Sequence, residues 1–144
     1  MHISARADYA VRAMVTAASY PDGPVKAAKL AEDQDIPLSF LHGILLDLRR
    51  AGLMFSQRGG GGGYALARPA GEISVGDILR TLQGSLSTVR GMPSQQVAYE
   101  GVAAGLPELW RSIEAAIAEV VDRATLTDVL VGQRSPVDLP PPPS

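Results

Sequence analysis

Five consecutive glycines, Gly59 to Gly63, constrain the fold of this chain more than any other feature. Glycine loses more conformational freedom on folding than any other residue, so such a run is unfavourable inside a helix or a strand. The run separates two short segments that contain aromatic and aliphatic residues, LMFSQR (53–58) and YALA (64–67). This arrangement predicts a β-hairpin whose turn consists of Gly59, Gly60, Gly61, Gly62 and Gly63.

A glycine-rich loop can also bind a nucleotide phosphate, which would indicate an enzyme or a nucleotide-binding protein. A P-loop needs Lys-Ser/Thr and a helix after its glycines, and the dinucleotide fingerprint G-x-G-x-x-G also opens a helix. Here Gly63 is followed by Tyr64 and a predicted strand. The sequence also has no nucleophile elbow, carboxylate pair or histidine cluster, so we expect no enzyme.

Three helices are predicted before the hairpin. The first begins at Ser4, a good N-cap residue, and ends before residues 21–23, and the second runs from about 25 to 34. After a break that ends at Pro37, the third continues to a glycine stop at Gly52. Its apolar residues have helical spacing and predict a buried stripe: Leu41, Ile44, Leu45 and Leu48.

Two short helices after a supporting helix are typical of a helix-turn-helix, and a hairpin that follows directly is typical of a wing. Many three-helix domains share the helical pattern, so it does not identify DNA binding by itself. The next segment predicts a capped helix, with Ser74 as N-cap, Asp77 in a capping box, and Ile73 and Ile78 as a hydrophobic staple. This helix is expected to end near Gly84.

The last third of the chain predicts a loop and then one long helix. Residues 85–105 have no clear period and are interpreted as a loop with a helical turn at most. From residue 106 the period returns and predicts a helix over 106–131 with a heptad-like seam: Leu106, Trp110, Ile113, Ile117, Val120 and Ala124. A second copy of the chain is the simplest cover for this seam, and packing on its own domain is the alternative. Residues 132–144 are proline-rich and predict a disordered tail.

Composition excludes several classes of site. The chain of 144 residues has no cysteine, which excludes disulfides, thiolate zinc sites, cysteine-ligated iron–sulfur clusters and cysteine nucleophiles. It has no apolar run near the roughly 18 residues of a membrane span and no signal-peptide pattern, so we expect a soluble cytoplasmic protein without a membrane partner. Residues 1–68 carry a net charge of +2 and residues 69–144 one of −4, which permits but does not prove a polyanionic partner at the front.

Taken in order, these segments resemble the Rrf2 family of bacterial winged-helix regulators. The resemblance covers about Ile3 to Leu130 and depends on ADYAVRAM (7–14), residues 36–53, SQRGGGGGYALARP (56–69), ISVGDIL (73–79) and Trp110. It implies a mainly α fold with a small β-hairpin: a winged helix-turn-helix DNA-binding domain at 1–84, a variable sensor segment at 85–105 and a dimerisation helix at 106–131. The implied function is a homodimeric regulator that binds double-stranded DNA at a pseudo-palindromic operator, with repression favoured by analogy.

The resemblance also assigns site residues. Ser39, Phe40 and His42 would lie at the DNA-facing start of the recognition helix, with Ser56 and Arg58 at the wing, where an arginine suits a narrow minor groove. Long cations at the edge of the domain suit phosphates, and these are Arg49, Arg50, Lys26 and Lys29. His42 is either a base contact or an exposed helix histidine. We further predict a wing tip that is mobile in the free dimer and ordered on DNA.

Family members that sense through an iron–sulfur cluster hold it with cysteines between the short helix and the long one, where this chain has none. With only His2 and His42 as imidazoles, we expect no metal and no cofactor. The effector would then be a small molecule or a regulatory protein. The alternative is a protein-interaction module with degenerate DNA binding, which the small net charge favours and Arg49, Arg50 and Arg58 oppose. Operator, signal and target genes stay open.

Overall fold

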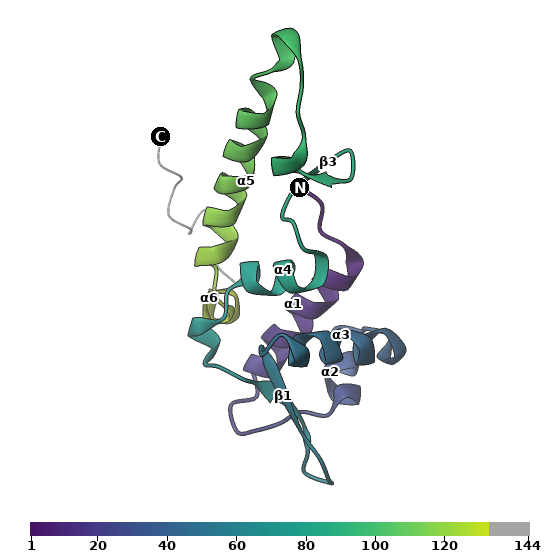
Figure 1. Ribbon diagram of the computed structural model, residues 1–144. Coiled ribbons are helices and arrows are strands. Elements are labelled where there is room, and N and C mark those ends of the chain that lie inside the picture. The colour runs from purple at the N-terminus through teal and green to yellow at the C-terminus, as the bar shows by residue number, and fades with distance from the viewer. Residues whose placement is uncertain (133–144) are drawn as a thin grey trace.

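The computed structural model describes residues 1–132, and the tail predicted at 132–144 lies outside these residues except for its first position. Figure 1 shows a body of short helices from which the β1–β2 hairpin projects, and a long helix, α5, that extends in the opposite direction. The helices are α1 (Ala5–Ala18), α2 (Ala27–Gln34), α3 (Leu38–Arg50), α4 (Val75–Gln83), α5 (Leu106–Arg123) and α6 (Leu126–Gly132). The strands are β1 (Met54–Gln57), β2 (Gly63–Leu66), β3 (Thr88–Val89) and β4 (Met92–Pro93). Three 3-10 turns complete the fold: η1 (Ala70–Glu72), η2 (Ser94–Gln96) and η3 (Gly101–Ala103). The predicted mainly α fold with a small hairpin is confirmed.

Helix α1 is the central element of the body, because it contacts α2, α3, α4 and α6. Ser4 caps it as predicted, since its Oγ accepts a hydrogen bond from the Ala7 amide at 3.0 Å. The buried face consists largely of alanines, which let neighbouring helices approach closely. Helical spacing predicts a buried stripe for this helix that consists of Ala7, Ala10, Val11, Met14 and Ala18. Val11 and Ala18 are only half-buried, whereas Ala13, outside this stripe, is fully buried. Several helices surround α1, so its buried face is wider than one stripe.

Helix α2 begins at Ala27 and not at the predicted Val25. The Val25 amide donates to the Tyr64 carbonyl at 2.8 Å, and the Tyr64 amide donates to the Val25 carbonyl at 2.7 Å. Val25 therefore forms a single antiparallel β-bridge with Tyr64 of β2. This bridge attaches β2 to the chain just before α2.

The hairpin itself is antiparallel, with a register that runs from Met54 opposite Leu66 to Gln57 opposite Gly63. Gly63 therefore belongs to β2 and not to the turn, which corrects one of the five predicted turn positions. Its φ is +147°, and a Cβ added there would lie 2.3 Å from the Val25 carbonyl oxygen. A Cβ at Gly62 would lie 2.2 Å from the Gln57 carbonyl oxygen, whereas Gly61 is surrounded by open space. The five glycines thus have different structural roles.

Helix α4 follows its sequence signals closely. The Ser74 Oγ accepts from the Asp77 amide at 3.0 Å, and the Asp77 carboxylate accepts from the Ser74 amide at 3.1 Å, which completes the predicted capping box. Ile73 and Ile78 are both fully buried. The helix ends at Gly84, whose φ of +73° is readily adopted by glycine.

The single long helix predicted over 106–131 is wrong at its end, because α5 stops at Arg123 and α6 starts at Leu126. The Ala124 carbonyl accepts from the Val75 amide at 2.7 Å, and the Leu126 amide donates to the Ile73 carbonyl at 3.0 Å. These bonds hold the break against the start of α4. Leu126 is fully buried in the core of the winged-helix body, so burial of its side chain favours the break.

Residues 85–105 contain more structure than the predicted loop. They form the small antiparallel hairpin β3–β4 and the turns η2 and η3. Ser94 and Val97 from this segment are 1% and 5% exposed, so the segment packs on the protein and contacts α5 through η2. Its regular elements are each too short to produce a recognisable period in the sequence.

Candidate nucleic-acid interface

Helix α3 presents one buried face and one exposed face. The predicted stripe of Leu41, Ile44, Leu45 and Leu48 is confirmed, with each residue at most 1% exposed. At about 100° per residue, Ser39, Gly43 and Arg50 lie about half a turn away from this stripe, and all three are exposed. His42 is exposed beside them. The start of α3 therefore offers small and polar groups to an external partner.

Phe40 is also at the start of α3, and its side chain is 64% exposed. It is the most exposed aromatic side chain of the described residues. An aromatic ring in this position can make an apolar contact with the methyl group of a thymine in a major groove. Phe40 is thus available for the role that the resemblance implies.

The wing is connected to the helices by two side chains. Lys26, directly before α2, donates from Nζ to the carbonyl of Gly59 in the wing turn at 2.8 Å. Arg49, near the end of α3, donates from Nη1 to the Ser56 hydroxyl of β1 at 3.2 Å. Both pairs join residues that were predicted separately for the helices and for the wing. The structure therefore assembles these four positions into one surface.

The predicted phosphate contacts differ in how available they are. Lys29 forms an ion pair with Asp33 at 2.9 Å, and the hydrogen bond in this pair raises the pKa of Lys29. Asp33 also accepts a hydrogen bond from the Tyr20 hydroxyl at 2.6 Å, and this bond lowers the pKa of the Asp33 carboxyl. Lys29 must therefore leave a carboxylate, or share it, before it binds a phosphate.

Arg50 and Arg58 are in the opposite situation. Both are exposed, and within residues 1–132 neither has a hydrogen bond or an ion pair. Their guanidinium groups would not need to leave a protein partner to reach an anion. Among the predicted cations these two are the most available for DNA.

Arg6 of α1 borders the same surface, although the sequence analysis did not select it. Its guanidinium forms an ion pair with Asp47 of α3 at 2.6 Å and lies 3.7 Å from where a Cβ at Gly43 would be. The pair balances the one carboxylate of α3, which would otherwise repel a phosphate. No spacing within α3 could have indicated Arg6, because it comes from a distant segment.

The outer face of α5 carries an apolar seam that differs from the predicted one. Leu109, Ile113, Ala116 and Val120 are all exposed and follow each other at spacings of four, three and four residues; we call them the α5 seam. Leu109, Ile113 and Val120 are 51%, 42% and 58% exposed. Ile113 and Val120 belong to both the predicted and the observed exposed set.

The other predicted seam residues face the protein itself. Ile117 packs against the buried cluster of Ala7, Leu79 and Leu86, and the Trp110 indole N–H donates to the Tyr99 hydroxyl at 3.3 Å. Leu106 and Ala124 are half-buried. The two apolar faces of α5 follow similar heptad spacings, so the sequence period alone did not separate the inner face from the outer one.

Comparison with known proteins gives a consistent result. The family model Rrf2, described as an iron-dependent transcriptional regulator, matches residues 3–132. An HTH-type protein of Mycobacterium tuberculosis (strain ATCC 25618 / H37Rv) is 44% identical over 133 residues, which cover 92% of this chain and 83% of the relative. The regulator IscR of Pectobacterium carotovorum (strain PC1) is 34% identical over 140 residues, covering 96% of this chain and 84% of that protein.

Solved structures agree with this likeness. CymR, the global cysteine regulator of B. subtilis, superposes with a TM-score of 0.77 and 33% identity over 90% of this chain and 96% of its own. IscR of T. potens superposes with a TM-score of 0.74 and 32% identity over 99% of this chain and 94% of its own.

The donor set of this chain does not fit the iron in the family description. The full sequence has no cysteine, and residues 1–132 contain no group of three or more His, Cys, Asp or Glu side chains that could hold a metal ion. Iron–sulfur clusters are held mainly by thiolates, which no residue here supplies. Within the same residues, no helix has both the length and the apolar character needed to cross a membrane.

Proposed function

Because the chain belongs to the Rrf2 family of DNA-binding transcriptional regulators and is a cysteine-free member of it, we propose that it acts as a homodimeric repressor at a pseudo-palindromic operator. Family members are not enzymes. The observation that carries the proposal is the single surface formed by the exposed face of α3 and the wing, where Arg50 and Arg58 have no protein partner among residues 1–132. Genomic DNA as target implies action in the cytoplasm.

We assign different tasks to the residues of this surface. Ser39, Phe40 and His42 at the start of α3 would contact base edges in the major groove, because the first turn of a recognition helix reaches deepest. Arg58 would enter the adjacent minor groove, whose negative potential attracts an arginine. Arg50 and Lys26 would bind phosphates and set the position of the domain on the duplex.

The remaining cations and Ser56 have supporting tasks in this proposal. Arg49 and Ser56 hold β1 close to the end of α3 through their hydrogen bond, and either group can turn to a phosphate. Lys29 contributes less, because Asp33 balances its charge. Lys26 has three donors, so it can keep the Gly59 carbonyl and still contact DNA.

Dimerisation would bury the α5 seam against a second copy. Isolated apolar side chains on a surface are normal, but an ordered stripe of Leu109, Ile113, Ala116 and Val120 is suited to helix pairing. A twofold axis at this seam would present two α3 helices to one duplex, which explains a pseudo-palindromic operator. The signal would be a small molecule or a regulatory protein, because the residues do not fit an iron–sulfur cluster.

The test is selection of genomic DNA fragments at near-physiological salt with the full chain. We expect a small set of fragments to be retained far better than random duplex, and simultaneous replacement of Ser39 and Phe40 by Ala should abolish this preference. As a matched control, the variant in which Ser112 and Glu119 on α5 are both replaced by Ala should retain the same fragments as the parent. Equal retention of all fragments would refute sequence-specific regulation and favour the protein-interaction alternative, which co-purification with and without nuclease would then examine.

A further inference from the structure

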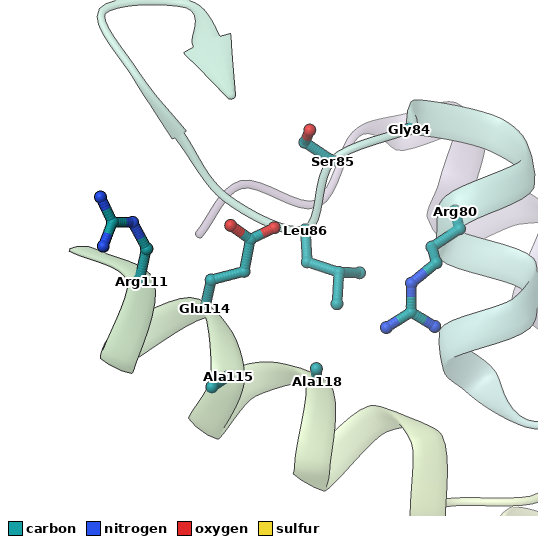
Figure 2. Close-up of a pocket in the computed structure, with 8 residues that line it drawn as sticks. All are labelled: Arg80, Gly84, Ser85, Leu86, Arg111, Glu114, Ala115 and Ala118. Atoms are coloured by element: carbon teal, nitrogen blue, oxygen red, sulfur yellow. The ribbon is translucent and has the colours of Figure 1, made fainter. Parts of the chain in front are cut away.

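A pocket of about 600 Å³ lies between α4, the turn that follows it, and the middle of α5. Its wall includes Arg80 of α4, residues 84–86 of the turn, and side chains of α5, as Figure 2 shows. Sites for small organic ligands typically have volumes of about 300–1,000 Å³. None of the residues assigned above to DNA or to the α5 seam lines this pocket.

The pocket lining combines two arginines, Arg80 and Arg111, with an apolar wall. The Arg111 guanidinium points away from Arg80 and Leu86 (Figure 2). In Figure 2 the Arg80 guanidinium points from α4 toward Ala118 of α5, and Leu86 lies beside it. Leu86 is only 3% exposed, so this wall is firmly packed. The side chains of Ala115 and Ala118 are short and leave the space above α5 open. A ligand with an anionic end and an apolar body would match both parts of the lining.

A carboxylate at the border restricts the charge of such a ligand. Glu114 lines the pocket and accepts a hydrogen bond from the hydroxyl of Ser94, which ties η2 to α5. Together with Arg80 and Arg111 it gives the lining a net charge of +1 (2 − 1). A single negative charge directed at Arg80 would balance this net charge. The lining therefore matches a monoanion.

The pocket is compatible with the proposed dimer. At about 100° per residue, Arg111, Ala115 and Ala118 point about half a turn away from the α5 seam. A second copy that covers the seam would leave this opposite face of α5 uncovered. The pocket can therefore be occupied in the dimer.

We propose that this pocket binds a small amphipathic monocarboxylate, whose carboxylate pairs with Arg80 and whose apolar part lies against Leu86, Ala115 and Ala118. Arg80 already binds one carboxylate: its Nη1 and Nη2 donate to the two oxygens of Asp122 at 2.6 and 3.0 Å. The ligand and Asp122 compete for the same guanidinium, so binding of one weakens the contact of the other.

The competition matters because the Arg80–Asp122 pair joins two functional parts of the chain. α4 contacts α1 and α3 of the winged-helix body, while Asp122 lies near the end of α5. The pair sits close above Gly76, where an added Cβ would lie 2.0 Å from the Asp122 Oδ1. Loss of this pair would change how α5 is held against the DNA-binding body. This regulatory step rests on the proposed function, whereas ligand binding itself does not.

The binding test is isothermal titration calorimetry of the full chain with octanoate and, as an uncharged ligand of equal length, 1-octanol. We expect saturable binding of one octanoate per chain and much weaker binding of octanol. Arg80→Gln should weaken octanoate binding at least about tenfold, because a charge-assisted pair is lost. The control Arg123→Gln removes an exposed arginine at the end of α5 that does not line the pocket, and it should bind as the parent does. Equal affinity for octanol, an unchanged Arg80→Gln affinity, or no saturable octanoate binding at millimolar concentration would overturn the proposal.

Two further measurements separate binding from regulation. Asp122→Asn should strengthen octanoate binding, because it removes the carboxylate that competes for Arg80. The control Glu119→Gln removes the same charge from the same helix and should leave the octanoate affinity unchanged. Equal octanoate affinities of the two variants would refute competition between the ligand and Asp122. Octanoate should change the affinity for a selected operator fragment in the parent and not in Arg80→Gln. An unchanged operator affinity with octanoate bound would refute regulation and leave the pocket standing. If no fragment is selected at all, the proposed function fails, and calorimetry still decides the pocket.

Discussion

Replacement of Gly63 by Ala should destabilise the protein far more than the same replacement at Gly61, although both glycines belong to one uninterrupted run. An added Cβ at Gly63 would lie 2.3 Å from the Val25 carbonyl oxygen and 2.8 Å from the Lys26 amide nitrogen, so the backbone before α2 must move. The φ of +147° is also rarely adopted by an alanine. Around Gly61 nothing lies within 4 Å of the added atom.

The magnitude follows from two effects. Backbone strain of this kind costs about 1–3 kcal/mol. If residues 25 and 26 withdraw, the two hydrogen bonds between Val25 and Tyr64 are weakened, at about 0.5–1.5 kcal/mol each. Gly63→Ala should therefore lower the free energy of unfolding by about 2–6 kcal/mol. Gly61→Ala should change it by less than about 1 kcal/mol, because the position is unstrained and alanine only restricts the unfolded chain.

Urea denaturation at one fixed protein concentration measures both values, since the stability of the proposed dimer would depend on concentration. DNA binding provides a second readout: movement of residues 25–26 displaces Lys26, which holds the Gly59 carbonyl in the wing, so Gly63→Ala should also bind operator DNA more weakly than Gly61→Ala. Unfolding free energies of the two variants within about 0.5 kcal/mol of each other would refute this reasoning, because surface substitutions without special contacts differ by no more than that.

Three other substitutions test separate parts of the structure. Arg58→Ala should weaken operator binding and, if the arginine neutralises a phosphate, reduce the slope of log affinity against log salt by about one unit. Fluorescence anisotropy at several salt concentrations measures both the affinity and the slope, and the control Arg123→Ala should change neither. An unchanged operator affinity of Arg58→Ala would remove the wing from the interface. Val120→Asp should weaken dimerisation at least about tenfold in sedimentation equilibrium, because it places a charge in the α5 seam. The control Ala98→Asp should leave dimerisation unchanged. An unchanged dimer affinity of Val120→Asp would exclude the α5 seam as the dimer interface. Leu126→Ala should cost about 2–5 kcal/mol in urea denaturation, since its side chain is fully buried, and a cost below about 1 kcal/mol would contradict its place in the core.

The site was predictable where one element supplies all its residues. The stripe of Leu41, Ile44, Leu45 and Leu48 determined which face of α3 is exposed, and the structure agrees with that face. Contacts between distant segments were not predictable, because no local pattern records them: Lys26 with Gly59, Arg49 with Ser56, and Arg6 with Asp47. The same limit applies to Lys29, whose pairing with Asp33 reduces its availability. The mobility of the wing tip stays a prediction.

The sequence by itself determined the features that depend on neighbours a few residues apart. Ser4, Ser74 and Asp77 cap their helices, Gly84 ends α4, and the glycine run reverses the chain, because hydrogen bonds and backbone sterics of this kind act within one turn.

Only the tertiary structure decided which of two equally periodic faces of α5 packs inward, because the choice depends on Leu79 and Leu86 from other segments. It also decided where the last helix breaks, since burial of Leu126 beside α4 outweighs the continuation of one helix. For the same reason, only the folded chain distinguishes Gly63, which the Val25 carbonyl approaches, from its identical neighbour Gly61.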